Sequence, residues 1–491
     1  MELSKKKSEE QPRNLWMRLH VTIGSTIESE DTDEKIIYME DLEKRARVYG
    51  ICGECNEPGT GSSWCRPCNA KRFKENFKNW TSGNKDIDEL IQQSQLNALH
   101  FTKFLEWIPY NNFEDITYIT SGGFGKIYSA KWPEGYIRCW DIENQKWIRD
   151  SYFTVALKSL DNSSDIGAAF LNEVKSHLLI YFEDVVRCFG VTQDPITKNY
   201  MMVLRYCKHG NLRNYLRQSE YINLNSKIGK LSEIARGLLN IHNSGKVHKD
   251  FHSGNILLDS AFSYISDLGM CQPVNDKMVE EGIYGVLPYM APEVLRGHQY
   301  TKEADIYSFG IIMNEFMTEE IPYNNIPHDH SLGVKICKGF RPKISNDTPK
   351  LISDLIIKCW DAKVKNRPTT KELYQILKKF YNERNNKNSE IHSQIVKCEK
   401  IRKTKLKRSG SNENRFNKPE NIQIHSKAIY TSRLLNFNNL PEPTNSSDLL
   451  FTSNSDVVQS PTENLISECF DCQLSESDLD EIDEIDEIDD A

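Results

Sequence analysis

Six short motifs, spread in a fixed order over the middle of this chain, constrain its fold more than its composition does. In sequence order they are Ser121-Gly122-Gly123-Phe124-Gly125, Val155-Ala156-Leu157-Lys158, Phe170-Leu171-Asn172-Glu173, His248-Lys249-Asp250-Phe251-His252-Ser253-Gly254-Asn255, Asp267-Leu268-Gly269 and Ala291-Pro292-Glu293. Glycines allow backbone N–H groups to approach phosphates closely. A lysine at the end of an apolar strand is costly to bury without an anionic partner. Aspartate and asparagine oxygens suit magnesium. The order therefore predicts a phosphate-handling site assembled from distant segments.

Together these motifs resemble the protein kinase catalytic domain, over residues 112–381, a little over half of the chain. The form Asp250-Phe251-His252-Ser253-Gly254-Asn255 is most similar to the tyrosine-kinase-like group. The resemblance implies an α+β, bilobal fold, with an antiparallel sheet and one main helix in the N-lobe and a mostly helical C-lobe. The residue pattern agrees, because it is strand-rich up to Val203 and helical after Gly210-Asn211-Leu212.

The resemblance also implies an activity, which is ATP-dependent transfer of the γ-phosphoryl group to protein hydroxyls in intracellular signalling. Asp250 would accept or orient the substrate proton, while Lys158 would pair with the phosphates and with Glu173. Asn255 and Asp267 would bind two Mg²⁺ ions. The expected nucleotide-binding residues are Gly122, Gly123, Gly125 and Lys158, with Leu204, Arg205, Tyr206 and Cys207 at the hinge that contacts adenine.

Three further residues are expected to support this site from the C-lobe. Glu293 should form a buried ion pair with Arg367, whose loss would be strongly destabilising. Asp305, at the start of a helix, should bind the backbone of the segment that carries Asp250.

The motifs depart from the kinase pattern at several positions. Thr120 stands where the family prefers glycine, and Lys249 stands where it prefers arginine, a bidentate partner for anions. No serine or threonine lies between Asp267 and Glu293, so we expect activity without Ser/Thr phosphorylation of that segment. His252 and Val286 replace the usual lysine and threonine of Ser/Thr kinases. The group resemblance still favours Ser/Thr substrates; a tyrosine or dual-specificity kinase and a pseudokinase scaffold or adaptor are the alternatives.

Four of the thirteen cysteines form the pattern C-x2-C-x9-C-x2-C, at Cys52, Cys55, Cys65 and Cys68. Two such pairs can bind one Zn²⁺ tetrahedrally with no open position, so residues 45–80 are interpreted as a zinc-ribbon-like structural module. A redox pair or an accidental cluster is the alternative. The module or the C-terminal tail could bind a protein partner; nucleic-acid contact through the module's lysines and arginines is not favoured, because the net charge of the chain is −8.

The remaining segments are expected to flank these two units. Residues 1–35 and 382–491 are polar with few aromatic residues, which predicts disorder. Apolar spacing over residues 86–108 predicts an amphipathic helix that covers the N-lobe, with a separate partner-binding helix as the alternative. The tail contains a basic run, 400–408, which could be a nuclear-import signal or a solvated linker. Its acidic end, 480–489, could fold back onto basic surface or keep the tail soluble.

The sequence also limits where the protein is expected to act. We find no apolar run long enough to span a membrane, and the charged N-terminus does not resemble a secretory signal. The cysteines outside the cluster are scattered, as is typical of reduced thiols. We therefore expect a cytoplasmic protein that acts on protein substrates, with nuclear import through the basic run as the alternative.

Overall fold

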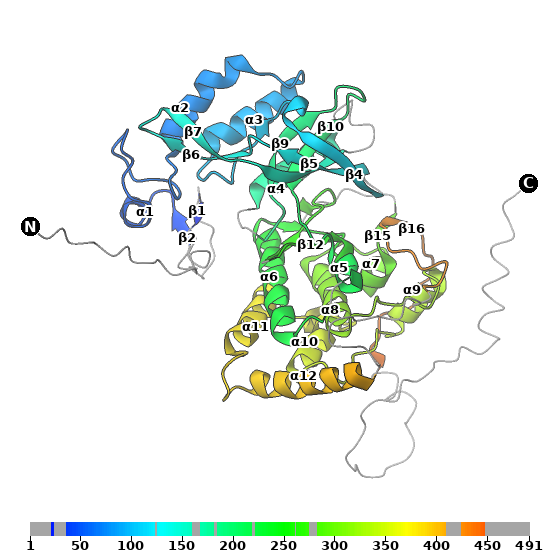
Figure 1. Ribbon diagram of the computed structural model, residues 1–491. Coiled ribbons are helices and arrows are strands. Elements are labelled where there is room, and N and C mark those ends of the chain that lie inside the picture. Colours follow the sequence, from blue (N-terminus) through cyan, green and yellow to red (C-terminus); the bar gives the residue numbers. More distant parts are fainter. Residues whose placement is uncertain are drawn as a thin grey trace, which may run out of the picture. The chain divides into compact units, whose positions relative to one another are not determined.

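The strand-rich part of the chain forms a six-stranded sheet with the order β3-β9-β10-β8-β5-β4 (Figure 1). A computed structural model describes residues 21–23, 36–122, 125–159, 167–180, 184–218, 221–260, 262–273, 282–408 and 424–446. The strands of the sheet are β3 (Glu106–Trp107), β4 (Glu114–Gly122), β5 (Gly125–Trp132), β8 (Phe153–Ser159), β9 (Cys188–Gln193) and β10 (Tyr200–Arg205). Only the short edge strand β3 pairs in parallel, with β9; the other pairs are antiparallel, which confirms the predicted N-lobe sheet.

One helix of this lobe, α4 (Ala168–Leu179), packs against the sheet through Phe170 and Val174. A hairpin of β6 (Tyr136–Asp141) and β7 (Lys146–Asp150) forms its own two-stranded sheet in the connection between β5 and β8. The sequence patterns did not predict this hairpin.

A second helix, α3 (Lys85–Asn97), packs into the same apolar cluster as α4 and the sheet. The side chain of Asn84 caps it, accepting hydrogen bonds from the backbone N–H groups of Asp86 and Ile87. Ile87 and Ile91 are fully buried in the same apolar cluster as Phe170 and Val174. Helix α3 packs on the N-lobe where the sequence predicted a covering helix, but it ends at Asn97, so the predicted range of 86–108 is too long. The apolar residues there enter the core from turns and from β3 instead of from a helix.

The N-terminal region before α3 contains β1 (Val21–Ile23), β2 (Ile36–Tyr38), α1 (Leu42–Tyr49) and α2 (Arg66–Asn76). Strands β1 and β2 pair in parallel. The rest of the predicted disordered segment 1–35 lies outside the described residues.

Helices form most of the second lobe, as the motif resemblance implies. They are α5 (Leu212–Gln218), α6 (Leu224–Asn243), α7 (Pro292–Leu295), α8 (Lys302–Thr318), α9 (His330–Cys337), α10 (Lys350–Cys359), α11 (Thr370–Glu383) and α12 (Glu390–Arg408). Residues of α6, α8, α10 and α11 share one large apolar core. Short strand pairs complete the lobe: β11 (Lys246–Val247) with β14 (Gln272–Pro273), β12 (Ile256–Leu258) with β13 (Ser263–Ile265), and β15 (Ile283–Gly285) with β16 (Arg433–Leu435).

Two segments beyond residue 382 pack against this lobe, where the sequence predicted no fixed structure. Ile391, Ile395 and Cys398 of α12 belong to the large core. Leu435 and Leu440, in residues 424–446, belong to it as well. The prediction for 382–491 is therefore wrong for these segments, because a few apolar side chains find room in a core that the preceding helices have already formed. The acidic end, 480–489, lies outside the described residues.

The basic run lies in the last turns of α12, and part of it is used for packing. Arg402 is buried and donates a 2.9 Å hydrogen bond to Glu319, which also pairs at 2.8 Å with the fully buried Lys227 of α6. Lys403 and Lys405 of the same run are exposed, so only part of the run is used for packing, and its role as an import signal stays a prediction.

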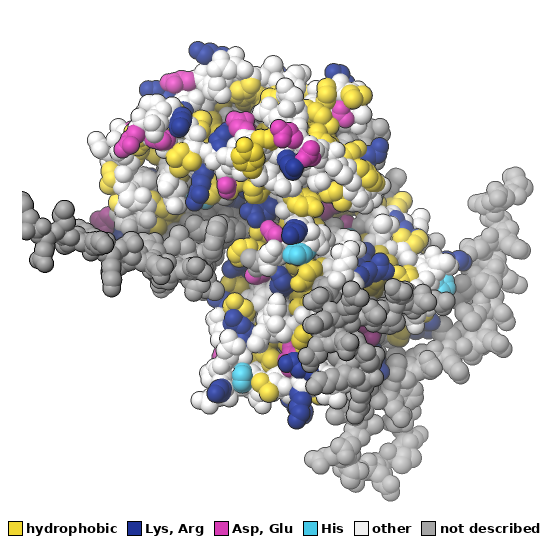
Figure 2. Space-filling model, in the orientation of Figure 1, with side chains coloured by type: hydrophobic (Ala, Val, Ile, Leu, Met, Phe, Trp, Pro, Cys, Tyr) yellow, Lys and Arg dark blue, Asp and Glu magenta, His cyan; other side chains and the backbone are white. Residues whose placement is uncertain are grey.

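Charged side chains of both signs lie interspersed on the face shown in Figure 2. No helix in the described ranges is long and apolar enough to cross a membrane.

Candidate active site

The segment that carries Asp250 is held in place by the start of helix α8. Asp305, in the first turn of α8, accepts hydrogen bonds from the backbone N–H groups of His248 and Lys249 at 2.8 and 3.1 Å. His242 of α6 contacts the same carboxylate at 2.8 Å. The predicted role of Asp305 is thereby confirmed. Thr301 caps α8, and an anion in the first turn of a helix is stabilised by the helix dipole.

Lys158, Glu173 and Asp267 come together from three elements far apart in the sequence. The Nζ atom of Lys158 on β8 lies 2.8 Å from a carboxylate oxygen of Glu173 on α4. It lies 3.0 Å from Oδ1 of Asp267, which belongs to the second lobe. Burial alone would lower the pKa of Lys158, but the carboxylates of Asp267 and Glu173 outweigh it and raise that pKa. Lys158 is therefore a fixed cation between the lobes.

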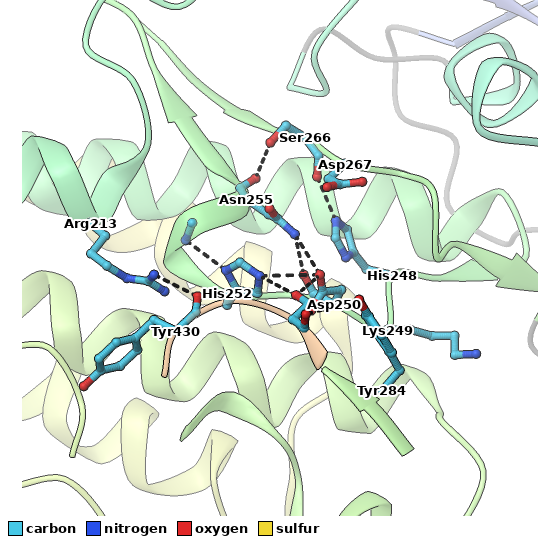
Figure 3. A network of polar contacts seen from close by, with 12 residues as sticks. Arg213, His248, Lys249, Asp250, His252, Asn255, Ser266, Asp267, Tyr284 and Tyr430 are labelled. Carbon is cyan, nitrogen blue, oxygen red and sulfur yellow. Dashed lines mark hydrogen bonds and ion pairs between the residues drawn. The ribbon is translucent and has the colours of Figure 1, made fainter. Parts of the chain in front are cut away.

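Asp250 is the centre of a second group of polar side chains (Figure 3). Asn255 donates from Nδ2 to the Asp250 backbone oxygen at 2.9 Å and to its Oδ2 at 3.3 Å. His252 accepts the N–H of Gly254 at Nδ1, which directs its Nε2 to within 3.5 Å of Asp250 Oδ2. Oδ1 of Asp250 is buried and has no hydrogen-bond partner in the described part of the chain.

The backbone is strained at two positions beside these groups. Lys249 and Asp267 have φ of 68° and 61°, in the left-handed region that side chains other than glycine and asparagine rarely adopt. Such conformations cost about 1–3 kcal/mol each and collect at functional sites.

Ser266 connects the two groups, since its N–H and hydroxyl both donate to the backbone oxygen of Asn255, at 2.8 and 3.0 Å.

The residues predicted to bind the nucleotide belong to the β4–β5 turn and to the end of β10 with the segment that follows it. Gly122 and Gly125 face each other at the β4–β5 turn, while Gly123 lies outside the described residues. Leu204 and Arg205 end strand β10. The hinge residues that follow are Tyr206 and the buried Cys207.

The predicted ion pair between Glu293 and Arg367 is present in the C-lobe. The Arg367 guanidinium donates to both carboxylate oxygens of Glu293, at 2.6 and 2.8 Å, and its side chain is fully buried. A third bond goes to the backbone oxygen of Asp361 at 2.9 Å. This bidentate pair fixes α7 to the loop before α11.

The C-terminal segment 424–446 approaches Asp250, and the sequence patterns predicted none of the residues that make these contacts. The hydroxyl of Ser432 donates to Asp250 Oδ2 at 2.6 Å and lies 3.3 Å from His252 Nε2. Arg213 of α5 donates to the backbone oxygen of Tyr430 at 3.1 Å, as Figure 3 shows. No motif marks these residues, because about 180 residues separate Ser432 from Asp250.

The four clustered cysteines form a separate candidate metal centre. Their sulfur atoms all lie within 4.8 Å of one another, and the Cys52–Cys68 and Cys55–Cys65 pairs are 3.9 and 3.6 Å apart. Four thiolates at about 2.3 Å from one zinc ion would be about 3.8 Å apart, so the cluster fits Zn²⁺. Cys65 is the N-cap of α2 and Cys68 lies in its first turn, where the helix dipole favours thiolates.

This module packs onto the β6–β7 hairpin through aromatic rings. Trp64 and Phe73 stack on Trp147 of β7, with ring centroids 6.1 and 5.0 Å apart. Arg72 lies 4.3 Å above the ring of Trp140. The missed hairpin is therefore one of the surfaces that attach the module to the N-lobe, together with Ala98 and Phe104.

Comparison with known protein families agrees with this geometry. The model of the family described as "Protein tyrosine and serine/threonine kinase" matches residues 114–377. This range contains Lys158, Glu173, Asp250 and Asp267.

Individual relatives are similar over about half of the chain. "Probable LIM domain-containing serine/threonine-protein kinase" of Dictyostelium discoideum is 35% identical over 53% of this chain and 26% of its own length. "RGS domain-containing serine/threonine-protein kinase A" of the same organism is 29% identical over 53% of this chain and 22% of its own length. "Tyrosine-protein kinase SPK-1" of Girardia tigrina is 27% identical over 52% of this chain and 51% of its own length.

The shared region thus makes up about half or less of the length of each of these relatives. The family model, by contrast, spans more than half of this chain and includes both groups of polar residues described above. The chain belongs to the protein tyrosine and serine/threonine kinase family.

Proposed function

We propose that this protein is an active kinase that transfers the γ-phosphoryl group of ATP to serine or threonine hydroxyls of proteins, with Mg²⁺. The contact of Lys158 with both Glu173 and Asp267 is the observation that carries the proposal. A scaffold that only binds partners needs no buried lysine paired with two carboxylates from different lobes, since such an arrangement is costly to form.

Each group of the site fits one requirement of phosphoryl transfer. Lys158 supplies positive charge for the phosphates, and Asp267 with the Oδ1 atom of Asn255 supplies hard oxygen ligands for Mg²⁺. Asp250 accepts or orients the proton of the attacking hydroxyl. Asn255 and His252 orient the Asp250 carboxylate, and its unpartnered Oδ1 leaves an acceptor for a substrate or for water on the metal.

The path of the backbone past Asp250 supports Ser/Thr substrates. A chain paired with β15 brings a serine hydroxyl to 2.6 Å from the Asp250 carboxylate, as Ser432 shows. A tyrosine side chain on the same backbone would extend several ångströms too far. The match to two Ser/Thr kinases among the relatives above agrees with this preference.

The test is incubation of the purified full chain with Mg²⁺, radiolabelled ATP and a generic protein substrate, followed by phosphoamino-acid analysis. Label on serine or threonine that disappears in Asp250→Asn supports the proposal. Label on tyrosine would contradict the substrate class, and equal label in wild type and Asp250→Asn would contradict the activity.

We also infer that Cys52, Cys55, Cys65 and Cys68 bind one structural Zn²⁺. The fit of their spacing to a tetrahedral site supports this, as does the small size of the module, which has few apolar residues of its own. One zinc per chain by elemental analysis, lost on mutation of Cys52 and Cys55 to serine, is the expected result.

A further inference from the structure

The C-terminal segment 424–446 passes directly beside Asp250, the residue proposed above to accept the proton of the substrate hydroxyl. Ser432 is the point of closest approach to the site, where its hydroxyl lies between two groups of the catalytic segment. It donates to Asp250 Oδ2 at 2.6 Å and can accept the Nε2–H of His252 at 3.3 Å. A substrate hydroxyl needs this arrangement, with a base to take the proton and its oxygen held in place.

The backbone around Ser432 is held as a strand. Residues 433–435 form β16, which pairs antiparallel with β15, so that Gly285 faces Arg433 and Ile283 faces Leu435. The Tyr284 hydroxyl donates to the backbone oxygen of Ser432 at 3.1 Å. Strand addition of this kind is a common way to bind an extended peptide, because main-chain hydrogen bonds supply affinity without regard to side chains.

Side chains fix the register on the N-terminal side of Ser432. Tyr430 lies with its ring 4.8 Å from the Arg213 guanidinium and 4.8 Å from the His328 ring. Its hydroxyl donates to the backbone oxygen of Pro322 at 2.8 Å. His328 also contacts the backbone of Ile429.

Buried apolar side chains fix the register on the C-terminal side. Leu435 and Leu440 are 5% and 9% exposed, within the core of the lobe. Asn445 accepts the backbone N–H of Ala362 at 2.9 Å and donates to Asp361 at 3.1 Å. Since the segment is fixed on both sides, Ser432 is the hydroxyl that the register presents to Asp250.

We propose that Ser432 is an autophosphorylation site modified within the same molecule, and that segment 424–446 excludes protein substrates until this happens. This proposal rests on the proposed function. The Oγ atom of Ser432 attacks the γ-phosphorus of ATP and forms a new O–P bond, while the bond from that phosphorus to the β,γ-bridging oxygen breaks. ADP leaves with the electron pair of that bond, and the hydroxyl proton passes to Asp250.

Phosphorylation of Ser432 should weaken the binding of segment 424–446 to the site. Phosphoserine has no O–H to donate to Asp250, and it adds a charge of about −1.5 to −2 beside a buried carboxylate. Repulsion between the two anions favours release of the segment. Release would leave the edge of β15 that now pairs with β16 free to pair with other proteins.

The chemical test maps phosphate on the full chain by mass spectrometry after incubation with Mg²⁺ and ATP. We expect Ser432 to be the main site, and its rate per molecule to stay constant over a roughly hundredfold dilution. Ser432→Ala should lose this phosphate, whereas Thr431→Ala, which removes the exposed neighbouring hydroxyl, should keep it. A rate per molecule that falls in proportion to dilution, or an unmodified Ser432 in an active enzyme, overturns the proposal.

A matched pair of leucine variants tests whether segment 424–446 blocks the access of protein substrates to β15. Leu435 is buried and Leu434 is 60% exposed, so Leu435→Asp should displace the segment and Leu434→Asp should not. If the docked form makes up about nine tenths of the molecules before Ser432 is modified, Leu435→Asp raises the initial rate of transfer to an added protein substrate about tenfold. Tyr430→Ala, a smaller change, should act in the same direction. Unchanged rates in folded Leu435→Asp and Tyr430→Ala overturn the blocking role.

Hydrogen exchange without nucleotide separates this inference from the proposed function. The amides of β15 and β16 should be protected in the wild type, Ser432→Ala and Leu434→Asp, and should exchange rapidly in Leu435→Asp. If no variant transfers phosphate, the proposed function fails, and the exchange data alone decide whether the segment docks. If Leu435→Asp phosphorylates an added protein but the wild type leaves Ser432 unmodified, the function stands and this inference fails.

Discussion

Asp250 retains its negative charge in a buried position because its neighbours favour the carboxylate. Burial alone would raise its pKa, but the nearby His252 and the hydrogen bonds from His252 and Ser432 outweigh burial and bring the pKa to about 2. This value lies below the ordinary value of about 3.9. The ionised form therefore adds stability that is present above about pH 4 and is lost as the pH falls through the folded-state pKa.

Asp250→Asn should lower phosphoryl transfer by about 10²–10⁴-fold, because an amide cannot accept the hydroxyl proton. Above pH 4 the wild-type rate should show no acid limb from this group. Steady-state rates between pH 5 and 9 measure both expectations. Asp354→Asn, at an aspartate 47% exposed on α10, is the control and should keep wild-type activity. Residual activity above a tenth in Asp250→Asn would contradict the role.

Arg367→Ala should cost about 3–5 kcal/mol of stability, because it leaves the Glu293 carboxylate without its buried partner. Lys350→Ala removes a pair with Asp354 in which the lysine is 78% exposed, and should cost less than about 1 kcal/mol. Chemical denaturation of both variants measures the difference. Equal losses would show that burial of the Glu293–Arg367 pair does not matter.

At the residue scale, the sequence predicts contacts that motifs encode and misses those that only the fold creates. The pairs Lys158–Glu173 and Glu293–Arg367 follow from motif positions, and both are present. The contact between Ser432 and Asp250 has no such signal. It depends on the path of a segment whose composition resembles a disordered tail.

Among the elements, the four-cysteine module, α3 and α4 form a continuous packed path to the site. The aromatic cluster around Trp64 and Phe73 includes Phe104, which leads into the buried Leu105 beside α3 and α4. Helix α4 carries Glu173, the partner of Lys158. We therefore expect loss of the proposed Zn²⁺ to disturb the Lys158–Glu173 ion pair through these packing contacts.

Cys52→Ser with Cys55→Ser should abolish zinc binding, lower the melting temperature and reduce transfer, because the module folds around the metal. Cys139→Ser, a half-buried cysteine of β6 outside the cluster, is the control and should retain the metal. Elemental analysis, thermal melts and rates measured on the same samples test this. Full activity in a zinc-free double variant would contradict the coupling.

Helix α12 packs into the core of the lobe through only a few apolar residues. Ile391, Ile395 and Cys398 recur at helical spacing in a charged segment, and this signal could have predicted the helix. The low overall hydrophobicity concealed it. The end of α3 at Asn97 was not predictable in the same way, since the apolar residues after it continue at a spacing compatible with a helix.

Ile395→Asp should destabilise the protein by about 3 kcal/mol or more, because it places a charge in the core of the lobe. Val396→Asp, one residue along and 55% exposed, should change stability by less than about 0.5 kcal/mol. Denaturation midpoints of the two variants give the comparison. Similar midpoints would mean that α12 does not pack as described.

For the whole molecule, the bilobal fold and the meeting of Lys158, Glu173 and Asp267 could be predicted from the motifs, while the position of the C-terminal segment beside Asp250 could not. Residues 424–446 contain no periodic pattern, and their position depends on partners such as Arg213 and His328 elsewhere in the chain. The segment 267–293 contains no serine or threonine, so Ser432 offers a hydroxyl for regulation that this segment lacks. Control of the kinase then depends on contact between distant parts of one chain.

The most direct test of the account compares Leu435→Asp with Leu435→Asp/Asp250→Asn. Because both proteins carry Leu435→Asp, segment 424–446 should be displaced from the site in both. Transfer of label from radiolabelled ATP to an added protein substrate is measured at equal protein concentration. We predict label on serine or threonine with the single variant, and a rate lower by about 10²-fold or more with the double variant. Equal rates, or no label from either folded protein, would contradict the claim that Asp250 lies at the centre of a phosphoryl-transfer site.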